Sequence, residues 1–206
     1  MIRALVLASR NAHKARELED LLAPWTVEPL PPEVVLPPET GTTFGDNAAI
    51  KARAAAVATG RLVVADDSGI EAAALDGAPG VRSARFAAEG ATDEENLARL
   101  LREVPRDGDR RVAYVCVLVL LEPSAEEPVV FEARCEGTLA IEPRGEGGFG
   151  YDPVFVPADL PGGRTMAELE RSEKDTISHR GRAARALLEW LEAREGVTAC
   201  ERVSAG

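Results

Sequence analysis

Three polar residues near the start of the chain have types and a spacing that suit phosphate binding. Ser9, Asn11 and Lys14 follow the apolar residues 2–8 in the pattern S-x-N-x-x-K. The apolar run predicts a short strand, and the leucines that follow recur at helical spacing, so the three residues should lie at a helix start. Helix N-termini attract anions through free backbone N–H groups and the helix dipole, and Lys14 adds a point charge. Alternatively, Ser9 or Asn11 only caps the helix and Lys14 is solvated.

Two adjacent carboxylates form a second candidate group. Asp66 and Asp67 follow the buried run 63–65 within D-D-S-G, and we expect the strand to end there, where α/β folds bind ligands. In an extended chain the two side chains point to opposite faces, and we select Asp67 as the one that faces a substrate. Carboxylates there could hold Mg²⁺ or accept a proton from water, with Glu39 as a further metal ligand. The alternative interpretation of D-D-S-G is a solvated turn.

A third group lies near the C-terminus. The sequence F-G-Y-D-P at residues 149–153 places aromatics in a glycine-rich loop, and Lys174, His179 and Arg180 follow. An aromatic ring there could stack on a nucleotide base, although Phe149 or Tyr151 could equally anchor the loop in the core. The cationic residues could read the base, or they could simply form a solvated helix start. Phosphate, metal and base sites together predict a nucleoside triphosphate ligand.

The elements that must position these groups alternate between helix and strand. Residues 29–41 hold five prolines and predict an extended loop. A helix should begin near residue 45 or 46 and end at Gly60, and Thr92 with Glu95 should cap another. We expect a long hairpin from residues 112–121 and 129–141, forming a second lobe. Thr165 with Glu168 forms another capping box, and residues 182–194 should form the final helix.

Composition limits the possible classes of protein. The chain has 206 residues, 45% of them hydrophobic, which suits one domain or two lobes sharing a core. The formal charge of −11 disfavours nucleic-acid binding but allows a small phosphorylated ligand. The three cysteines are odd in number, far apart and without a C-x-x-C pair, which argues against a disulfide framework or a zinc site. Cys116 and Cys135 should be buried thiols. No apolar run could span a membrane and no leader pattern is present, so we expect a cytoplasmic protein.

Six ordered motifs resemble the non-canonical purine nucleotide pyrophosphatases, the inosine triphosphatase family. The resemblance extends from Leu5 to about Leu191, and several ordered motifs are far more specific than one. The motifs are L-V-L-A-S-R-N-A-H-K-A-R-E-L, T-F-G-D-N-A-A-I-K-A, V-A-D-D-S-G, G-A-P-G-V-R-S-A-R-F-A, F-G-Y-D-P-V-F and T-M-A-E-L with E-K-D-T-I-S-H-R-G-R-A.

The resemblance implies an α/β fold with an elongated mixed sheet, flanking helices and two lobes around a central nucleotide cleft. Residues 1–206 would form one such domain in a homodimer that depends on Mg²⁺. Its implied activity is hydrolysis of dITP, ITP or XTP to the monophosphate and pyrophosphate, which would keep these nucleotides out of DNA and RNA.

The resemblance also implies roles for individual residues. Asp67 would accept a proton and, with Glu39, hold the metal. The substrate-binding residues would be Ser9, Arg10, Asn11, Ala12, His13, Lys14, Ser68, Phe149, Gly150, Tyr151, Asp152, Lys174, His179 and Arg180. Two positions depart from many relatives: Arg10 stands where they have glycine and adds charge near the phosphates, and Pro38 leaves Glu39 as the single carboxylate before Thr40.

Other readings differ in the reaction. A related pyrophosphatase of the Maf-like kind would act on pyrimidine or modified nucleotides. A nucleotide-binding regulator or an oligomeric scaffold would keep the pocket without turnover, although the acidic pair argues against this. A Rossmann dehydrogenase is disfavoured because no G-x-G-x-x-G follows the first strand.

Overall fold

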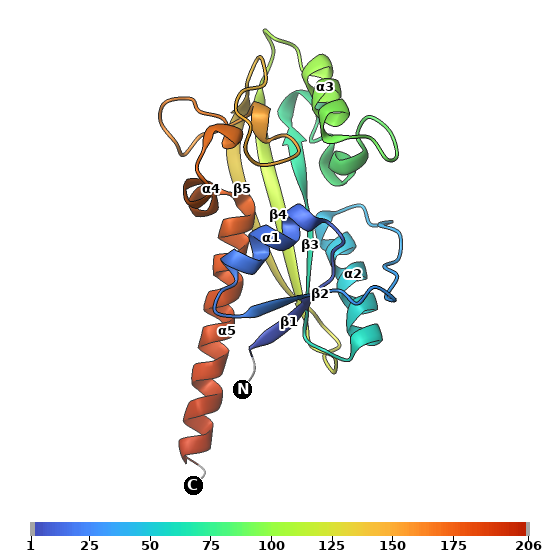
Figure 1. The fold of residues 1–206 in the computed structure, drawn as a ribbon, viewed down its shortest axis with the longest axis vertical. Helices are drawn as coiled ribbons and strands as arrows, with labels where there is room; N and C mark the ends of the chain where they lie inside the picture. The colour runs from blue at the N-terminus through green and yellow to red at the C-terminus, as the bar shows by residue number, and fades with distance from the viewer. Residues whose placement is uncertain (1–2, 205–206) are drawn as a thin grey trace.

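One six-stranded sheet runs through the whole molecule in the computed structural model, which describes residues 3–204 and the side chains of residues 3–194 (Figure 1). The spatial order of the strands is β2-β1-β3-β4-β5-β6. β1 is parallel to β2 and β3, and all other pairs are antiparallel, so the sheet is mixed as expected. The strands are β1 (Ala4–Leu7), β2 (Thr26–Pro29), β3 (Val63–Ala72), β4 (Arg111–Leu121), β5 (Val129–Leu139) and β6 (Phe155–Pro157).

Helices cover both faces of the lower part of this sheet. The α-helices are α1 (Ala12–Leu21), α2 (Phe44–Thr59), α3 (Asp93–Glu103), α4 (Arg171–Ile177) and α5 (His179–Ser204). Alanines of α2 pack on one face, against Val63 and Ala65 of β3. Leucines of α1 and α5 pack on the other face, against Val64 and Leu118. Successive strand residues therefore enter opposite cores, as the two-residue period of a strand requires.

The predicted helix boundaries are confirmed at three caps. The Asn11 side chain accepts from the backbone N–H groups of His13 and Lys14, so Asn11 is the N-cap of α1. Gly60 ends α2 with φ = +63°, a conformation that glycine adopts without a steric penalty. Thr92 and Glu95 form the predicted capping box of α3. These local signals are short-range, which explains why the sequence alone identified them.

The long hairpin of β4 and β5 carries the chain into a second lobe. The upper ends of β3, β4 and β5 extend beyond β1, and α3 lies beside them at the top of the molecule (Figure 1). A separate core there joins strand residues such as Ile70 and Tyr114 with Leu100 of α3 and Phe155 of β6. The two lobes therefore share one continuous sheet.

The predicted end of β3 is wrong. β3 continues through D-D-S-G to Ala72, because β4 pairs with it antiparallel along all ten residues, from Val63 to Ala72. This pairing continues the strand through Asp66 and Asp67, so D-D-S-G is neither a strand end nor a turn. β2 was not predicted, and its final residue Pro29 is tolerated because β2 is an edge strand. The last helix begins at His179 rather than at 182.

Other expectations concern loops, thiols and surface. Residues 30–43 contain neither helix nor strand, as the prolines predicted, and Cys116 and Cys135 are buried free thiols. Cys200 lies outside the residues whose side chains are described.

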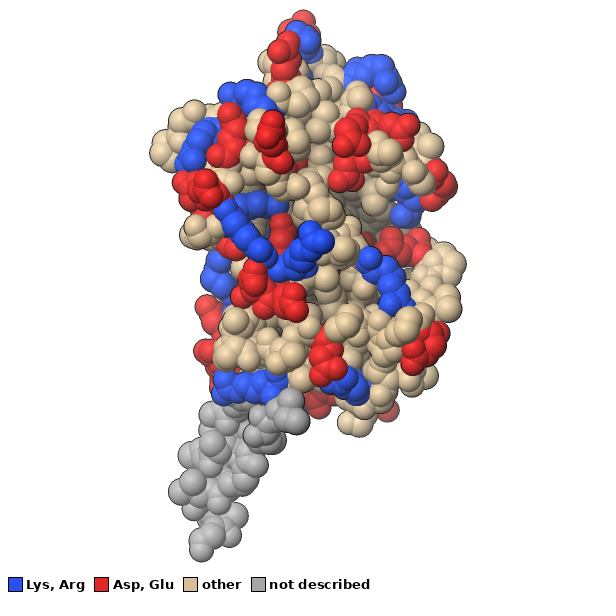
Figure 2. Space-filling view, viewed as in Figure 1, with Lys and Arg blue, Asp and Glu red and all other residues tan. Residues whose placement is uncertain are grey.

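No helix in the described part of the chain is long and apolar enough to cross a membrane. Acidic and basic side chains are intermixed on the face shown in Figure 2, and neither sign forms a continuous surface there.

Gly69 tests how tightly β3 is packed next to the acidic pair. A Cβ at Gly69 would lie 2.7 Å from the carbonyl oxygen of Gly80 and would also overlap the Ser83 side chain. We expect Gly69→Ala to lower the free energy of unfolding by about 1–3 kcal/mol through overpacking. Gly45→Ala in α2 is the control, because a Cβ at that position would lie 3.8 Å from the nearest atom, Thr43 Oγ1. This substitution should leave the free energy of unfolding unchanged or raise it by up to about 1 kcal/mol. Urea denaturation of the two variants measures the difference, and equal effects would contradict close packing at Gly69.

Candidate active site

A cavity of about 420 Å³ lies beside β3 at the point where β1 ends. β1 pairs with β3 only at Val63 and Val64, so on that side the described residues provide no strand partner for Asp66–Gly69. The edge of β3 is therefore open to a ligand at this level of the sheet. The volume lies within the range that small-molecule sites occupy.

Most of the residues predicted from the sequence line this one cavity. They come from the segment between β1 and α1, from α1, from the proline-rich loop of residues 30–43, from β3, from the glycine-rich loop and from the start of α5. The predicted residues in its lining are Ser9, Arg10, Asn11, Lys14, Glu39, Asp67, Ser68, Phe149, Gly150, Tyr151, Asp152, His179 and Arg180. Ala12, His13 and Lys174 do not line it, although His13 and Lys174 both contact Phe149.

Asp66 lies beneath the cavity and binds the residues around it. Its side chain is fully buried, and it accepts hydrogen bonds from Lys14, from Ser68 Oγ at 3.0 Å and from Arg180 Nε at 3.0 Å. The Cys116 thiol donates from below at 3.3 Å. Burial by itself would raise the pKa of Asp66, but Lys14 and Arg180 more than offset this and hold its pKa well below the ordinary value. Asp66 is thus an ionised anchor for the two cations.

Asp67 points to the other face of β3 and has a different environment. Lys51 Nζ of α2 lies 3.3 Å from Asp67 Oδ1 and 2.7 Å from Glu39 Oε1. Asp67 Oδ2 is buried and has no hydrogen-bond partner among the described residues. Burial raises the pKa of Asp67, and the opposing effects of Lys51 and Lys14 do not cancel that rise. Asp67 lines the cavity, whereas Asp66 is not among the lining residues.

Lys51 is a functional candidate that the sequence analysis missed. Its side chain is 8% exposed, and it lies on the buried face of α2 with Ala48, Ala52 and Ala55. A lysine on the apolar face of an alanine-rich helix is a signal that could have identified it, because a charged side chain is seldom buried without a partner.

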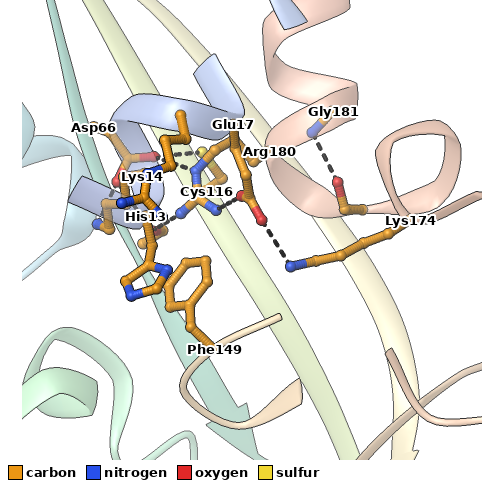
Figure 3. Close-up of polar contacts among 12 residues, drawn as sticks. His13, Lys14, Glu17, Asp66, Cys116, Phe149, Lys174, Arg180 and Gly181 are labelled. Carbon is orange, nitrogen blue, oxygen red and sulfur yellow. Dashed lines mark hydrogen bonds and ion pairs between the residues drawn. The ribbon is translucent and has the colours of Figure 1, made fainter. Parts of the chain in front are cut away.

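Glu17 of α1, also missed, joins two cations from distant parts of the chain. Its carboxylate accepts from Lys174 Nζ at 2.7 Å and from Arg180 Nη1, and Figure 3 shows it between these two side chains. Lys174 is held from the other side by Asp152 at 2.8 Å. Burial alone would lower the pKa of Lys174, but Asp152 and Glu17 raise it, so the ammonium stays charged. Lys174, His179 and Arg180 are all buried, which excludes the solvated helix start.

The two aromatic residues of the glycine-rich loop have separate positions. Tyr151 is buried, and its hydroxyl donates to the Ser83 carbonyl at 2.8 Å, so Tyr151 anchors the loop. Phe149 is half-buried and stacks on His13 with ring centroids 5.1 Å apart. Lys174 Nζ lies 5.1 Å from the centre of the Phe149 ring (Figure 3). Phe149 is therefore the ring that a planar ligand could meet.

His179 is a neutral polar group within the same cavity. It stacks on Tyr114 with ring centroids 4.6 Å apart, and its Nδ1 has no partner among the described residues. Burial and the neighbouring Arg180 hold the pKa of His179 well below its ordinary value. An uncharged imidazole offers one hydrogen-bond donor and one acceptor, which suits the edge of a base.

The N-terminal segment is only partly arranged as predicted. Asn11 caps α1, and Lys14 reaches Asp66 rather than solvent. Arg10 lines the cavity, but its guanidinium donates to carbonyl groups of residues 30–34 in the proline-rich loop. The positive charge expected near phosphate therefore comes from Lys14 and Lys51, with Arg10 turned to the loop.

Glu17→Gln tests the link between the two cations. Burial alone would raise the pKa of Glu17, but Arg180 and Lys174 lower it below 4.5. Its contribution to stability is therefore full above pH 4.5 and is lost as the pH falls through the lowered value. We expect the variant to lose about 1–3 kcal/mol of unfolding free energy near neutral pH, because two buried cations lose their shared partner.

The matched control is Glu19→Gln, an exposed position on the same helix. Chemical denaturation at about pH 7 and about pH 3.5 measures both variants, and the deficit of Glu17→Gln should shrink at the lower pH. A deficit that is equal for the two variants, or that grows in acid, would show that the carboxylate does not hold these cations.

The comparisons with known proteins identify the family of the chain. The model of the Ham1 family matches residues 5–190. A dITP/XTP pyrophosphatase of an Exiguobacterium species is 49% identical over 187 residues, which cover 89% of this chain and 94% of that protein. The dITP/XTP pyrophosphatase of Deinococcus radiodurans is 48% identical over 191 residues, covering 91% and 92%. The structure of a Ham1 protein from Coxiella burnetii superposes with a TM-score of 0.84 at 42% identity, covering 92% of this chain and 98% of that one. The chain belongs to the Ham1 family.

Proposed function

We propose that this chain hydrolyses the non-canonical purine nucleoside triphosphates dITP, ITP and XTP to the monophosphate and pyrophosphate, which would keep them out of DNA and RNA. The names of its relatives support the substrate class. The observation that carries the reaction is the cavity itself, which Asp67, Lys14 and Phe149 line together; Asp67 Oδ2 has no hydrogen-bond partner among the described residues. Carboxylate, cation and aromatic ring are the groups that a triphosphate hydrolase needs.

Asp67 and Glu39 are the proposed ligands of Mg²⁺. The donor set fits this ion, because Mg²⁺ is usually held by one or two carboxylates together with substrate phosphates and water. The orphaned Asp67 Oδ2 also fits, since a buried carboxylate oxygen without a partner costs free energy unless a ligand satisfies it. The Lys51 ammonium lies between the two carboxylates and forms an ion pair with each of them. When bound, Mg²⁺ would neutralise charge on the phosphate oxygens.

Asp67 is also the proposed general base for the attacking water. Burial raises its pKa, which favours proton uptake, and the nearby Lys51 opposes that rise. Lys14 and Lys51 would attract the phosphate chain, so positioning and electrostatics would supply most of the rate acceleration. The stable position of Lys14 depends on Asp66, which holds its ammonium group.

The cations near Phe149 support the proposed preference for keto purines. Lys174 and Arg180 can only donate hydrogen bonds, so either would donate to the 6-keto oxygen of hypoxanthine or xanthine. The 6-amino group of adenine would face donor against donor. A buried mismatch of this kind costs about 1–3 kcal/mol, which corresponds to discrimination of about tenfold to a few hundredfold.

A substrate panel tests this function. Purified protein is given dITP, XTP, dGTP, dATP and a pyrimidine triphosphate, with and without Mg²⁺, and products are separated by chromatography. Monophosphate and pyrophosphate formed with Mg²⁺, and much faster from dITP and XTP, would support the proposal. A preference for the pyrimidine, release of single phosphates, or binding without turnover would contradict it.

Asp67→Asn tests the proposed base. Because an amide cannot accept the proton, we expect kcat for dITP to fall by about 10²–10⁴-fold, with nucleotide affinity largely kept. The control is Glu132→Gln, since Glu132 is an exposed acid on β5 and pairs with Val117, the β4 partner of Asp67. Steady-state kinetics and calorimetric titration of dITP provide the readouts. Normal turnover in Asp67→Asn would remove this residue from the mechanism.

The proposal includes a homodimer that acts in the cytoplasm, on the strength of the family resemblance. Light scattering or sedimentation of the full chain measures the assembly, and a monomeric mass at working concentration would contradict the dimer.

A further inference from the structure

The Arg10 side chain was expected near the phosphates but contacts the proline-rich loop. Its guanidinium donates to four backbone carbonyls of the proline-rich loop, although Arg10 also lines the cavity. Nη1 lies 2.7 Å from the Leu30 oxygen, and Nη2 lies 2.7 Å from that of Pro31 and 2.8 Å from that of Val34. A longer contact of 3.3 Å reaches Pro32. One side chain therefore joins the segment that begins α1 to a loop more than twenty residues away.

The proline-rich loop has few hydrogen bonds of its own. Residues 30–43 contain no helix or strand, and the backbone hydrogen bond from Val34 to Pro31 is the one that the described structure contains within residues 30–41. Its prolines supply carbonyl acceptors but no N–H donors. A guanidinium has five N–H donors and no acceptor, so it can supply the donors that the proline-rich loop lacks. Long loops without secondary structure are commonly functional, and their order depends on such contacts.

This same loop carries Glu39 to the cavity. Leu36, Pro37 and Glu39 form part of the lining, and the Glu39 carboxylate faces Lys51 at 2.7 Å. Arg85 reaches Glu39 at the longer distance of 3.4 Å. The polar contacts that hold the loop include those of Arg10 at its beginning and the Glu39 ion pairs near its end, while Leu30, Val34 and Leu36 pack on the core. Loss of Arg10 would remove the side-chain hydrogen bonds at the beginning of the loop and leave the apolar packing and the Glu39 ion pairs in place.

We propose that Arg10 is a positioning residue that holds the proline-rich loop against the start of α1 and thereby fixes Glu39 at the proposed metal site. This proposal rests on the proposed function only for the metal-binding role of Glu39. Arg10 contacts backbone carbonyls, so its effect on the reaction is indirect. Residues that orient a metal ligand commonly change metal affinity about 10–100-fold when they are removed.

The first test is amide hydrogen exchange of the full chain without nucleotide. Arg10→Ala should make the Val34 amide, which donates to the Pro31 carbonyl, exchange several-fold faster, while α2 and β3 remain protected. Arg10→Lys should behave like Arg10→Ala, because a compact ammonium cannot span carbonyls that a planar guanidinium bridges. Arg16→Ala is the matched control, since Arg16 is an exposed arginine on α1. Unchanged exchange in Arg10→Ala, or wild-type exchange in Arg10→Lys, would overturn the proposal.

The second test measures metal use. Arg10→Ala should raise the Mg²⁺ concentration for half-maximal dITP turnover by about tenfold. Binding of Mn²⁺ alone, followed by electron paramagnetic resonance, should weaken in parallel and does not depend on turnover. Faster exchange with unchanged Mg²⁺ and Mn²⁺ dependence would overturn the positioning of Glu39.

A Glu39→Gln variant separates this failure from failure of the proposed function. If Glu39→Gln leaves the Mg²⁺ and Mn²⁺ dependence unchanged, the metal assignment of Glu39 is wrong, and the positioning role of Arg10 at the metal site is wrong with it. The hydrogen-exchange result would then report only that Arg10 holds the loop. If Glu39→Gln weakens metal use and Arg10→Ala does not, the metal site stands and the Arg10 proposal alone is overturned.

Discussion

The buried carboxylate of Asp66 is the interaction on which the rest of the site depends. Asp66 has no exposed surface, and its charge is maintained by Lys14 and Arg180, which belong to the first and last α-helices. An uncompensated charge in that position would be costly, so the two helix ends are held to β3. Arg180 in turn meets Glu17, and Glu17 meets Lys174. A single chain of ion pairs thus joins the phosphate side of the cavity to the proposed base-binding side.

The neighbouring carboxylate shows how one strand can present two acids with different properties. Asp66 and Asp67 are adjacent, but the pleat of β3 turns them to opposite faces. Asp66 receives four donors and has a lowered pKa, whereas Asp67 has one oxygen without a partner among the described residues and has a raised pKa. The first acid therefore organises cations, and the second is suited to proton transfer or to a metal. Environment rather than residue type separates their roles.

The opening of the sheet has a simple geometric cause. β1 stops at Leu7, while β3 continues to Ala72 in antiparallel pairing with β4. The edge of β3 beside Asp67 is thus exposed to the cavity, and the proline-rich loop closes the space beside it. Because a loop rich in proline cannot supply its own hydrogen bonds, its position must be set by other parts of the chain. Arg10 and the cations around Glu39 provide those contacts.

The sequence by itself determined the local elements and most of the chemical inventory. Helix caps such as Asn11 and Gly60 act within a few residues, and the hairpin strands carry their own apolar pattern, so both could be predicted. The tertiary structure decided the rest: the length of β3 depends on β4, and the partners of Lys51, Glu17 and Arg10 come from distant segments. Charge pairing across such separations leaves no periodic signal in a sequence, because it depends on where the fold brings the side chains together.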